Sequence, residues 1–172
     1  IVEKKQIWRS WHLVFLAEAR VILEDFKKAG VRNLILKGPV WQTARYGYLL
    51  DKPSADIDWL VDRTQYGRVR KILTGRGYRL KRLAWMKKEI YQGAVPRASE
   101  MTYIKRIYGR EVSIDLHLQA VREALTAWYK EPITKENMDQ LTDHLLGARV
   151  WRRGWPVLPD SENLFYLCFN LM

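Results

Sequence analysis

Residues 56–61 read Asp-Ile-Asp-Trp-Leu-Val, a short strand-forming run that carries two carboxylates. In a strand, side chains two positions apart point to the same face of the sheet. Asp56 and Asp58 therefore converge on one face, while Ile57 and Trp59 point to the other. Carboxylates held side by side repel each other, and their pKa values rise unless a cation lies between them. Mg2+ suits this role because it takes oxygen ligands and keeps coordination positions for phosphates. The plain alternative is a pair of solvated acids at a strand end.

A third carboxylate lies on a later apolar run. Residues 112–117 read Val-Ser-Ile-Asp-Leu-His, so Asp115 has apolar neighbours on both sides. An acid in such a strand is costly to bury unless it is paired or bound to a metal. The alternatives are a strand-end aspartate in water and an aspartate paired with an arginine. His117 follows on the same face, where it could orient Asp115, contact a nucleotide or an acceptor, or serve as a hydrogen-bonded structural residue.

A strand that runs directly into a glycine precedes both acidic segments. Residues 34–38 read Leu-Ile-Leu-Lys-Gly, and Pro39 stands where a helix can begin. This geometry lets backbone N–H groups and a helix N-terminus face phosphate. Lys37 would add a positive charge beside Gly38. The alternative is an ordinary strand–turn–helix connection.

The composition is that of a folded, globular protein. The chain has 172 residues, of which 48% are hydrophobic, and this predicts one domain or one domain with a helical appendage. Cys168 is the single cysteine, which excludes an internal disulfide and fits a reducing compartment, so we expect a cytoplasmic protein. No apolar run approaches the length needed to cross a bilayer, and no membrane partner is expected. We expect His12 and His144 to be structural.

Positive charge is concentrated in one segment. The formal net charge is +11, and residues 63–110 alone hold fourteen Lys and Arg against Glu89 and Glu100, a balance of +12. Such a basic block favours a polyanionic partner: nucleotide phosphates, nucleic acid or an acidic surface. Aromatic residues alternate with cations over 78–91, which would allow base stacking as well as phosphate contact. The alternatives are a solvated charged face and aromatic side chains packed on alternate faces of a sheet.

Hydrophobic periodicity predicts an alternation of helices and strands. Gly30 is expected to end the first helix, and Thr64 to cap the third. The final helix stops abruptly on an apolar face, so we expect the chain to be cut from a longer protein. The expected helices are 4–28, 39–48, 64–73 and 162–172, with further helical segments after residue 120. The expected strands are 31–36, 57–61, 78–85, 89–95, 101–108 and 111–118, with an extended link over 154–159.

Five short motifs follow one another in a recognisable order. They are Leu-Lys-Gly (36–38), Tyr46, Asp-Ile-Asp-Trp-Leu-Val (56–61), Gly-Arg-Gly-Tyr (75–78) and Ser-Ile-Asp-Leu-His (113–117). In this order they resemble the uncharacterised nucleotidyltransferases of the DNA polymerase β-like superfamily. The resemblance covers residues 30–120 and continues more loosely through 158–162. It implies an α+β, polymerase β-like nucleotidyltransferase fold in which a mixed β-sheet is flanked by helices. The implied organisation is a core with its N-terminal helix at 1–120 and a helical C-terminal extension at 121–172.

This resemblance implies a metal-dependent nucleotidyltransferase. Asp56 and Asp58 would bridge two Mg2+ or Mn2+ ions about 3.5–4 Å apart, as in other two-metal sites. Asp115 would bind one of these ions and help to remove the acceptor proton. The substrate would be a nucleoside triphosphate, with ATP expected, and the acceptor a hydroxyl of a small molecule, a protein or an RNA. Pyrophosphate would be released. The implied nucleotide-binding residues are Lys37, Gly38, Lys52 and His117.

Two positions depart from the pattern of the family. Pro39 follows Gly38 where relatives more often carry a small residue, and this removes a backbone donor and a hydroxyl contact to phosphate. Lys52 stands nearest to the position of an arginine in many relatives, and lysine cannot make the bidentate phosphate contact that arginine makes. Both changes concern the triphosphate site and leave the three acids in place.

Two further functions stay open on the residues alone. One is a catalytically weak nucleotide- or RNA-binding module that uses the basic face of residues 63–110. A pure binder has no need of paired carboxylates that repel its anionic ligand, so Asp56, Asp58 and Asp115 favour the enzyme. The other is a partner-regulated, toxin-like transferase acting on RNA ends, for which the sequence has no specific feature.

Overall fold

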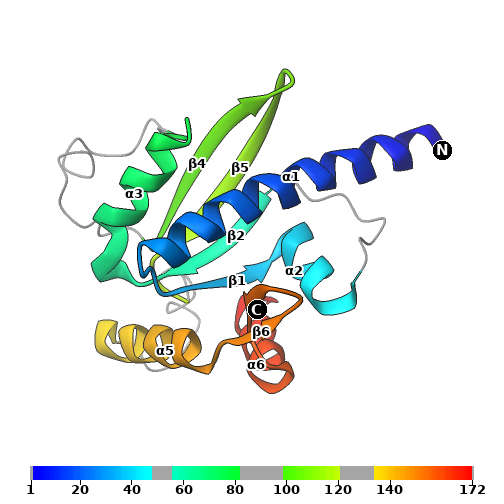
Figure 1. The fold of residues 1–172 in the computed structure, drawn as a ribbon. Helices are drawn as coiled ribbons and strands as arrows, with labels where there is room; N and C mark the ends of the chain where they lie inside the picture. The colour runs from blue at the N-terminus through cyan, green and yellow to red at the C-terminus, as the bar shows by residue number, and fades with distance from the viewer. Residues whose placement is uncertain (1, 48–55, 82–98, 121–133, 172) are drawn as a thin grey trace.

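The computed structural model describes residues 2–47, 56–81, 99–120 and 134–171, and within them seven strands form one mixed sheet. The strands lie in the order β3-β4-β5-β2-β1-β7-β6, so β2 is the central strand (Figure 1). Their bounds are β1 Asn33–Lys37, β2 Asp56–Val61, β3 Arg79–Leu80, β4 Glu100–Ile107, β5 Arg110–His117, β6 Val150–Arg152 and β7 Trp155–Val157.

Helices pack on both sides of this sheet. Figure 1 shows α1 and α3 on one side of β1, and α5 and α6 on the other. A short 3-10 helix at Arg63–Gln65 leads into α3. The helix bounds are α1 Val2–Lys28, α2 Gly38–Tyr46, α3 Tyr66–Gly75, α5 Lys135–Ala148 and α6 Asp160–Leu171.

Two separate sets of buried apolar side chains hold the layers together. The larger set includes Phe15 of α1 and Trp59 of β2. The smaller set joins Leu60 of β2 to Leu145 of α5 and Tyr166 of α6. Because Trp59 and Leu60 are neighbours, β2 sends alternate side chains to the two layers, as the period of a strand requires. The face that holds Leu60 is also the face on which Asp56 and Asp58 lie, so the acids and the smaller core share one side of the strand.

The predicted N-terminal helix over 4–28 is confirmed as α1, Val2–Lys28. Its helical stripe is fully buried at Phe15, Ala19 and Phe26, because these side chains recur on the face that meets the sheet. Gly30 follows the helix with φ +64°, the left-handed conformation that commonly ends a helix.

The start of the third helix differs from the prediction. Asp62, rather than Thr64, caps the 3-10 turn, since its side chain accepts a hydrogen bond of 2.9 Å from the Thr64 backbone N–H; α3 itself begins after Gln65 without a side-chain cap. The chain first makes the 3-10 turn and only then enters α3, which ends at Gly75. Aspartate and threonine are both good capping residues, so local propensity alone could not choose between positions 62 and 64.

The extended link expected over 154–159 contains a strand of the sheet. β7 forms an antiparallel hairpin with β6 and also pairs in parallel with β1, where Ile35 lies opposite Val157. The segment after residue 120 thus contributes two strands to the sheet as well as α5 and α6. Strands of three residues are too short to display a period, which explains why the sequence did not reveal them.

The strands predicted over 101–108 and 111–118 are confirmed as β4 and β5, and the mixed sheet with its flanking helices confirms the α+β class. Within the predicted strand 78–85, the described part contains the short strand β3. The predicted strand 89–95 and the stretch 121–133 lie outside the described residues. None of the helices in the described part has the length and apolar character that a membrane span requires.

Candidate active site

The three predicted acids lie on two neighbouring strands of the sheet. β2 and β5 pair in parallel, and the register places Asp58 opposite Asp115 and Asp56 opposite Ser113. Register partners in a sheet point to the same face, so all three carboxylates share one side. The alternate residues of both strands, among them Trp59 and Leu116, pack into the larger core on the other side.

Asp58 is the most buried of the three acids, with 1% of its surface exposed. Its Oδ1 lies 3.1 Å from Lys37 Nζ and 2.9 Å from His117 Nε2. Its Oδ2 is also buried but has no hydrogen-bond partner in the described part of the chain. A buried carboxylate oxygen without a partner is costly, so this atom is a strong attractor for a cation or a donor.

Lys37 reaches Asp58 because β1 carries an irregularity. Ile35 lies opposite Trp59, but Lys37, two residues later, lies opposite Asp58, the next residue of β2. The extra residue is a β-bulge, which reverses the face to which the following side chains point. Ile35 therefore packs into the larger core with Trp59, whereas Lys37 points to the carboxylate face.

The two other acids have raised pKa values. Burial is the main cause for Asp56, and the neighbouring carboxylates of Asp58 and Asp115 add to it. Burial also raises the pKa of Asp115, against the opposing effect of a hydrogen bond from Thr102, and the Glu100 carboxylate raises it further. Both shifts reflect negative charges confined together in a partly dry site, a condition that a bound cation relieves.

Gly38 holds the start of α2 against the acidic strand. Its φ is +88°, and a Cβ at this position would lie 2.7 Å from the backbone oxygen of Asp56. Only glycine permits both this conformation and this close approach. Pro39 is accommodated in the first turn of α2. Lys37 and Gly38, two of the predicted nucleotide-binding residues, are thus beside the acids, and Lys52 lies outside the described residues.

The uncharacterised nucleotidyltransferase family matches residues 4–172 of the chain. The chain belongs to this family. The match runs from α1 into the last residues and includes both acidic strands, which confirms the resemblance expected from the motifs. It supports a nucleotidyltransferase enzyme. Comparison with curated proteins and with solved structures gave no match.

Two residues of this candidate site were not predicted from the sequence. Glu100 lies opposite His117 in the pairing of β4 with β5, and its Oε2 is 3.7 Å from His117 Nδ1. Thr102 lies opposite Asp115 and hydrogen-bonds to it. His117 therefore sits between the carboxylates of Glu100 and Asp58. The sequence does contain a pattern that places them on one strand face: the polar residues Glu100 and Thr102 alternate with the apolar residues Met101 and Tyr103. The strand was, however, predicted to begin at Met101, which left Glu100 outside it.

The donor set of the site fits a hard cation such as Mg2+. Asp56, Asp58 and Asp115 supply carboxylate oxygens on one face, and Asp58 Oδ2 has no other partner in the described residues. Among those residues, however, no group of three His, Cys, Asp or Glu side chains is already arranged around a cation position. Lys37 and His117 both contact Asp58 Oδ1.

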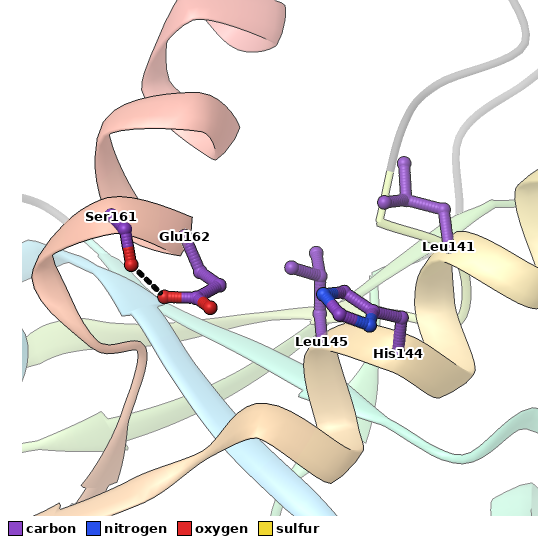
Figure 2. Close-up of a pocket in the computed structure, with 5 residues that line it drawn as sticks. All are labelled: Leu141, His144, Leu145, Ser161 and Glu162. Carbon is purple, nitrogen blue, oxygen red and sulfur yellow. Dashed lines mark hydrogen bonds between the residues drawn. The ribbon is translucent and has the colours of Figure 1, made fainter.

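A cavity of 340 Å³ lies away from these acids, between α5 and α6. Figure 2 shows Leu141, His144 and Leu145 of α5 facing Ser161 and Glu162 of α6, with a hydrogen bond between Ser161 and Glu162. None of the predicted site residues lines it. His144, which was expected to be structural, is an exposed residue at this cavity.

Proposed function

We propose that the chain is a metal-dependent nucleotidyltransferase that moves a nucleoside monophosphate from a nucleoside triphosphate, ATP in the first instance, to a hydroxyl acceptor. The acceptor oxygen forms a bond to the α-phosphorus, the bond between that phosphorus and the β-phosphate oxygen breaks, and pyrophosphate leaves. The observation that carries this proposal is the register of Asp58 with Asp115, which puts three carboxylates on one face, beside an Asp58 Oδ2 that has no partner in the described residues.

Asp56, Asp58 and Asp115 would hold the metal ions, Mg2+ or Mn2+. When bound, the ions neutralise the phosphate charge and lower the pKa of the acceptor hydroxyl. Asp115 would accept the hydroxyl proton, since it lies opposite Asp58 on the same face of the sheet. His117 would act as a positioning residue, since its Nε2 lies 2.9 Å from Asp58 Oδ1.

The triphosphate would bind where β1 passes into α2. The first backbone N–H groups of a helix have no partner within the helix and attract phosphate. Gly38 brings this end of α2 against the backbone of Asp56, and Lys37 adds an ammonium group beside Asp58. Positioning and charge neutralisation would provide most of the rate enhancement, as in other phosphoryl transfers.

A transfer assay with nucleoside triphosphate labelled at the α-phosphate tests this function. We expect Mg2+-dependent labelling of an acceptor by the native chain, and a loss of at least about a hundredfold in Asp58→Asn and Asp115→Asn. Asp139→Asn is the matched control, because Asp139 is an exposed carboxylate on α5 outside the site. Its activity should be that of the native chain.

Binding provides a second measurement that does not require the acceptor. We expect Mg2+ to tighten triphosphate binding in titration calorimetry, and Asp58→Asn to abolish this effect. If triphosphate binding is independent of Mg2+ and survives both active-site substitutions, the metal site does not exist and the proposal fails.

A further inference from the structure

The carboxylate face of the sheet continues beyond the acids as a partly open surface on β3, β4 and β5. Its members in the described part are Arg79, Lys81, Thr102, Ile104, Arg106, Glu111 and Ser113, which we call the outer sheet face. Pairing places Arg79 opposite Ile104, and Ile104 opposite Ser113, so these side chains share one side with Asp115. All seven are exposed or half-buried, whereas their neighbours Met101, Tyr103, Val112 and Ile114 are fully buried on the other side.

Within the described residues, cations of the basic block lie on both sides of the sheet. Two cations on the α1 side form ion pairs: Arg76 binds Asp25, and Lys105 binds Glu18. Arg110 packs on the ring of Trp11 of α1. These cations stabilise the docking of α1 and account for part of the block in structural terms.

The cations on the outer sheet face are engaged to a smaller extent. Arg79 and Arg106 are exposed, and within the described residues their side chains make no ion pair or hydrogen bond. Lys81 pairs with Glu111 at 3.3 Å, and both of these side chains are more than two-fifths exposed. Among the described residues, the outer sheet face therefore holds three cations, Arg79, Lys81 and Arg106, against one acid, Glu111.

An exposed aromatic residue stands at the end of this face. Tyr108 is 90% exposed at the tip of the β4–β5 hairpin, and its φ is +48°. Gly109 follows with φ +77°, so both central residues of the turn are left-handed, a geometry in which Asn-Gly is the favoured pair. A tyrosine here strains the backbone and buries no apolar surface. An outlier of this kind suggests a role in binding.

The outer sheet face leads directly to the carboxylates. Arg106 lies opposite Glu111, which precedes Asp115 by four residues on β5. At ~3.3 Å per residue, Arg106 is ~13 Å along the strand from the level of Asp115. A chain of phosphates bound across this face would reach the acids with its terminal hydroxyl.

We propose that the outer sheet face, with Tyr108 at its edge, binds a single-stranded nucleic acid whose terminal hydroxyl is the acceptor. This rests on the proposed function and names its acceptor class. Arg79 and Arg106 contact the phosphates, and Tyr108 stacks on a base, which is the usual combination in single-strand binding. The terminal hydroxyl oxygen bonds to the α-phosphorus of the triphosphate, pyrophosphate leaves, and Asp115 takes the proton.

The experiment measures the anisotropy of fluorescein-labelled 12-nucleotide RNA and DNA strands of one sequence, with the full chain, without triphosphate and over a range of salt. We expect binding to weaken with salt, because each phosphate contact adds about 0.7 to the logarithmic slope for single strands. The double variant Arg79→Gln/Arg106→Gln should lower the slope by about 1.4. The charge-matched control Arg70→Gln/Lys71→Gln on α3 should keep the native slope.

Tyr108→Asn should retain the fold, because Tyr108 is exposed and has a left-handed φ. Asparagine tolerates the left-handed turn better than tyrosine does, so thermal stability should be unchanged or higher. Loss of the stacked base should nevertheless weaken binding of the strand at least about fivefold. Equal affinity of native and Tyr108→Asn chains would overturn the stacking role.

Further variants distinguish a failure of the nucleic-acid surface from a failure of the proposed active site. Asp58→Asn should bind the strand as the native chain does but fail in transfer. If the outer-face double variant and the α3 control bind equally, the surface proposal falls, while Mg2+-dependent transfer to another acceptor would leave the proposed function intact. If poly-glutamate binds in an Arg79- and Arg106-dependent way and neither oligonucleotide does, the face binds an acidic protein and the nucleic-acid proposal is wrong.

Discussion

Lys37 and Asp58 are register partners on β1 and β2, and Lys37 Nζ lies 3.1 Å from Asp58 Oδ1. The aspartate is buried, while half of the lysine side chain is exposed. The pair therefore joins a carboxylate that is shielded from water to an ammonium group on a side chain that is half exposed to solvent. A bulge in β1 creates this contact, and the same bulge sets the path of the chain into Gly38 and α2.

The first prediction concerns this pair. Lys37→Met leaves the buried carboxylate of Asp58 with His117 as its remaining partner in the described residues. We expect the free energy of unfolding in EDTA, measured with urea, to fall by about 1–3 kcal/mol. Lys71→Met, on the exposed surface of α3, is the control and should change it by less than about 0.5 kcal/mol. Equal losses in the two variants would show that the ion pair does not stabilise the fold.

The second prediction concerns Gly38. Alanine at this position would adopt a left-handed φ and place its Cβ 2.7 Å from the Asp56 backbone oxygen. Because the conformational cost alone is about 1–2 kcal/mol, we expect Gly38→Ala to lose at least about 2 kcal/mol in urea unfolding. Gly67→Ala is the matched control, since Gly67 lies in α3 with open space around its Cβ position. It should be neutral or stabilising by up to about 1 kcal/mol.

The third prediction is the pH dependence of stability without metal. The pKa of Asp115 is raised in the folded protein, so between its unfolded and folded pKa values the folded state holds more protons than the unfolded state. Stability from this group is therefore full at low pH and is lost as the pH rises through the folded pKa. Asp115→Asn removes this charge. In thermal unfolding with EDTA, the melting temperature of the variant should rise relative to that of the native chain as the pH rises from 4 to 8.

An aspartate with the opposite shift gives the control for this prediction. The Arg76 guanidinium holds the pKa of Asp25 below its usual value. Its stabilising effect is present above the unfolded pKa and is lost as the pH falls through the folded pKa. Asp25→Asn should therefore lose stability relative to the native chain as the pH rises. The same trend in both variants would mean that the burial of Asp115 is not reflected in its ionisation.

The fourth prediction tests the core on the α1 side. The hydroxyl groups of Tyr66 and Tyr103 are both buried and lie 2.9 Å apart. Tyr103→Phe leaves the Tyr66 hydroxyl without this partner and should cost about 1–3 kcal/mol, and Tyr66→Phe should cost a similar amount. The double variant removes both polar groups and should cost far less than the sum of the two. Additive losses in a urea double-mutant cycle would contradict a direct bond.

The basic block shows that the charge of a segment does not tell which of its cations are available to bind a ligand. Its total charge predicted a polyanion-binding face, but the structure assigns Arg76 and Lys105 to ion pairs with α1. Tyr78, one of the aromatic residues considered for stacking, is buried and donates a hydrogen bond to Glu18. Which cations face solvent depends on the packing of a helix that lies far away in the chain, and charge counting along the sequence contains no information on this.

The sequence by itself determined the features that depend on local periodicity. The period of two placed Asp56 and Asp58 on one face, and the helical stripe of α1 and the strands around Asp115 followed from the spacing of apolar residues. Only the tertiary structure decided that β2 and β5 are parallel neighbours with Asp58 opposite Asp115, and that a bulge turns Lys37 toward them. Register and bulges are selected by the burial of whole faces and by close backbone approaches such as that of Gly38 to Asp56, and these involve residues distant in the chain.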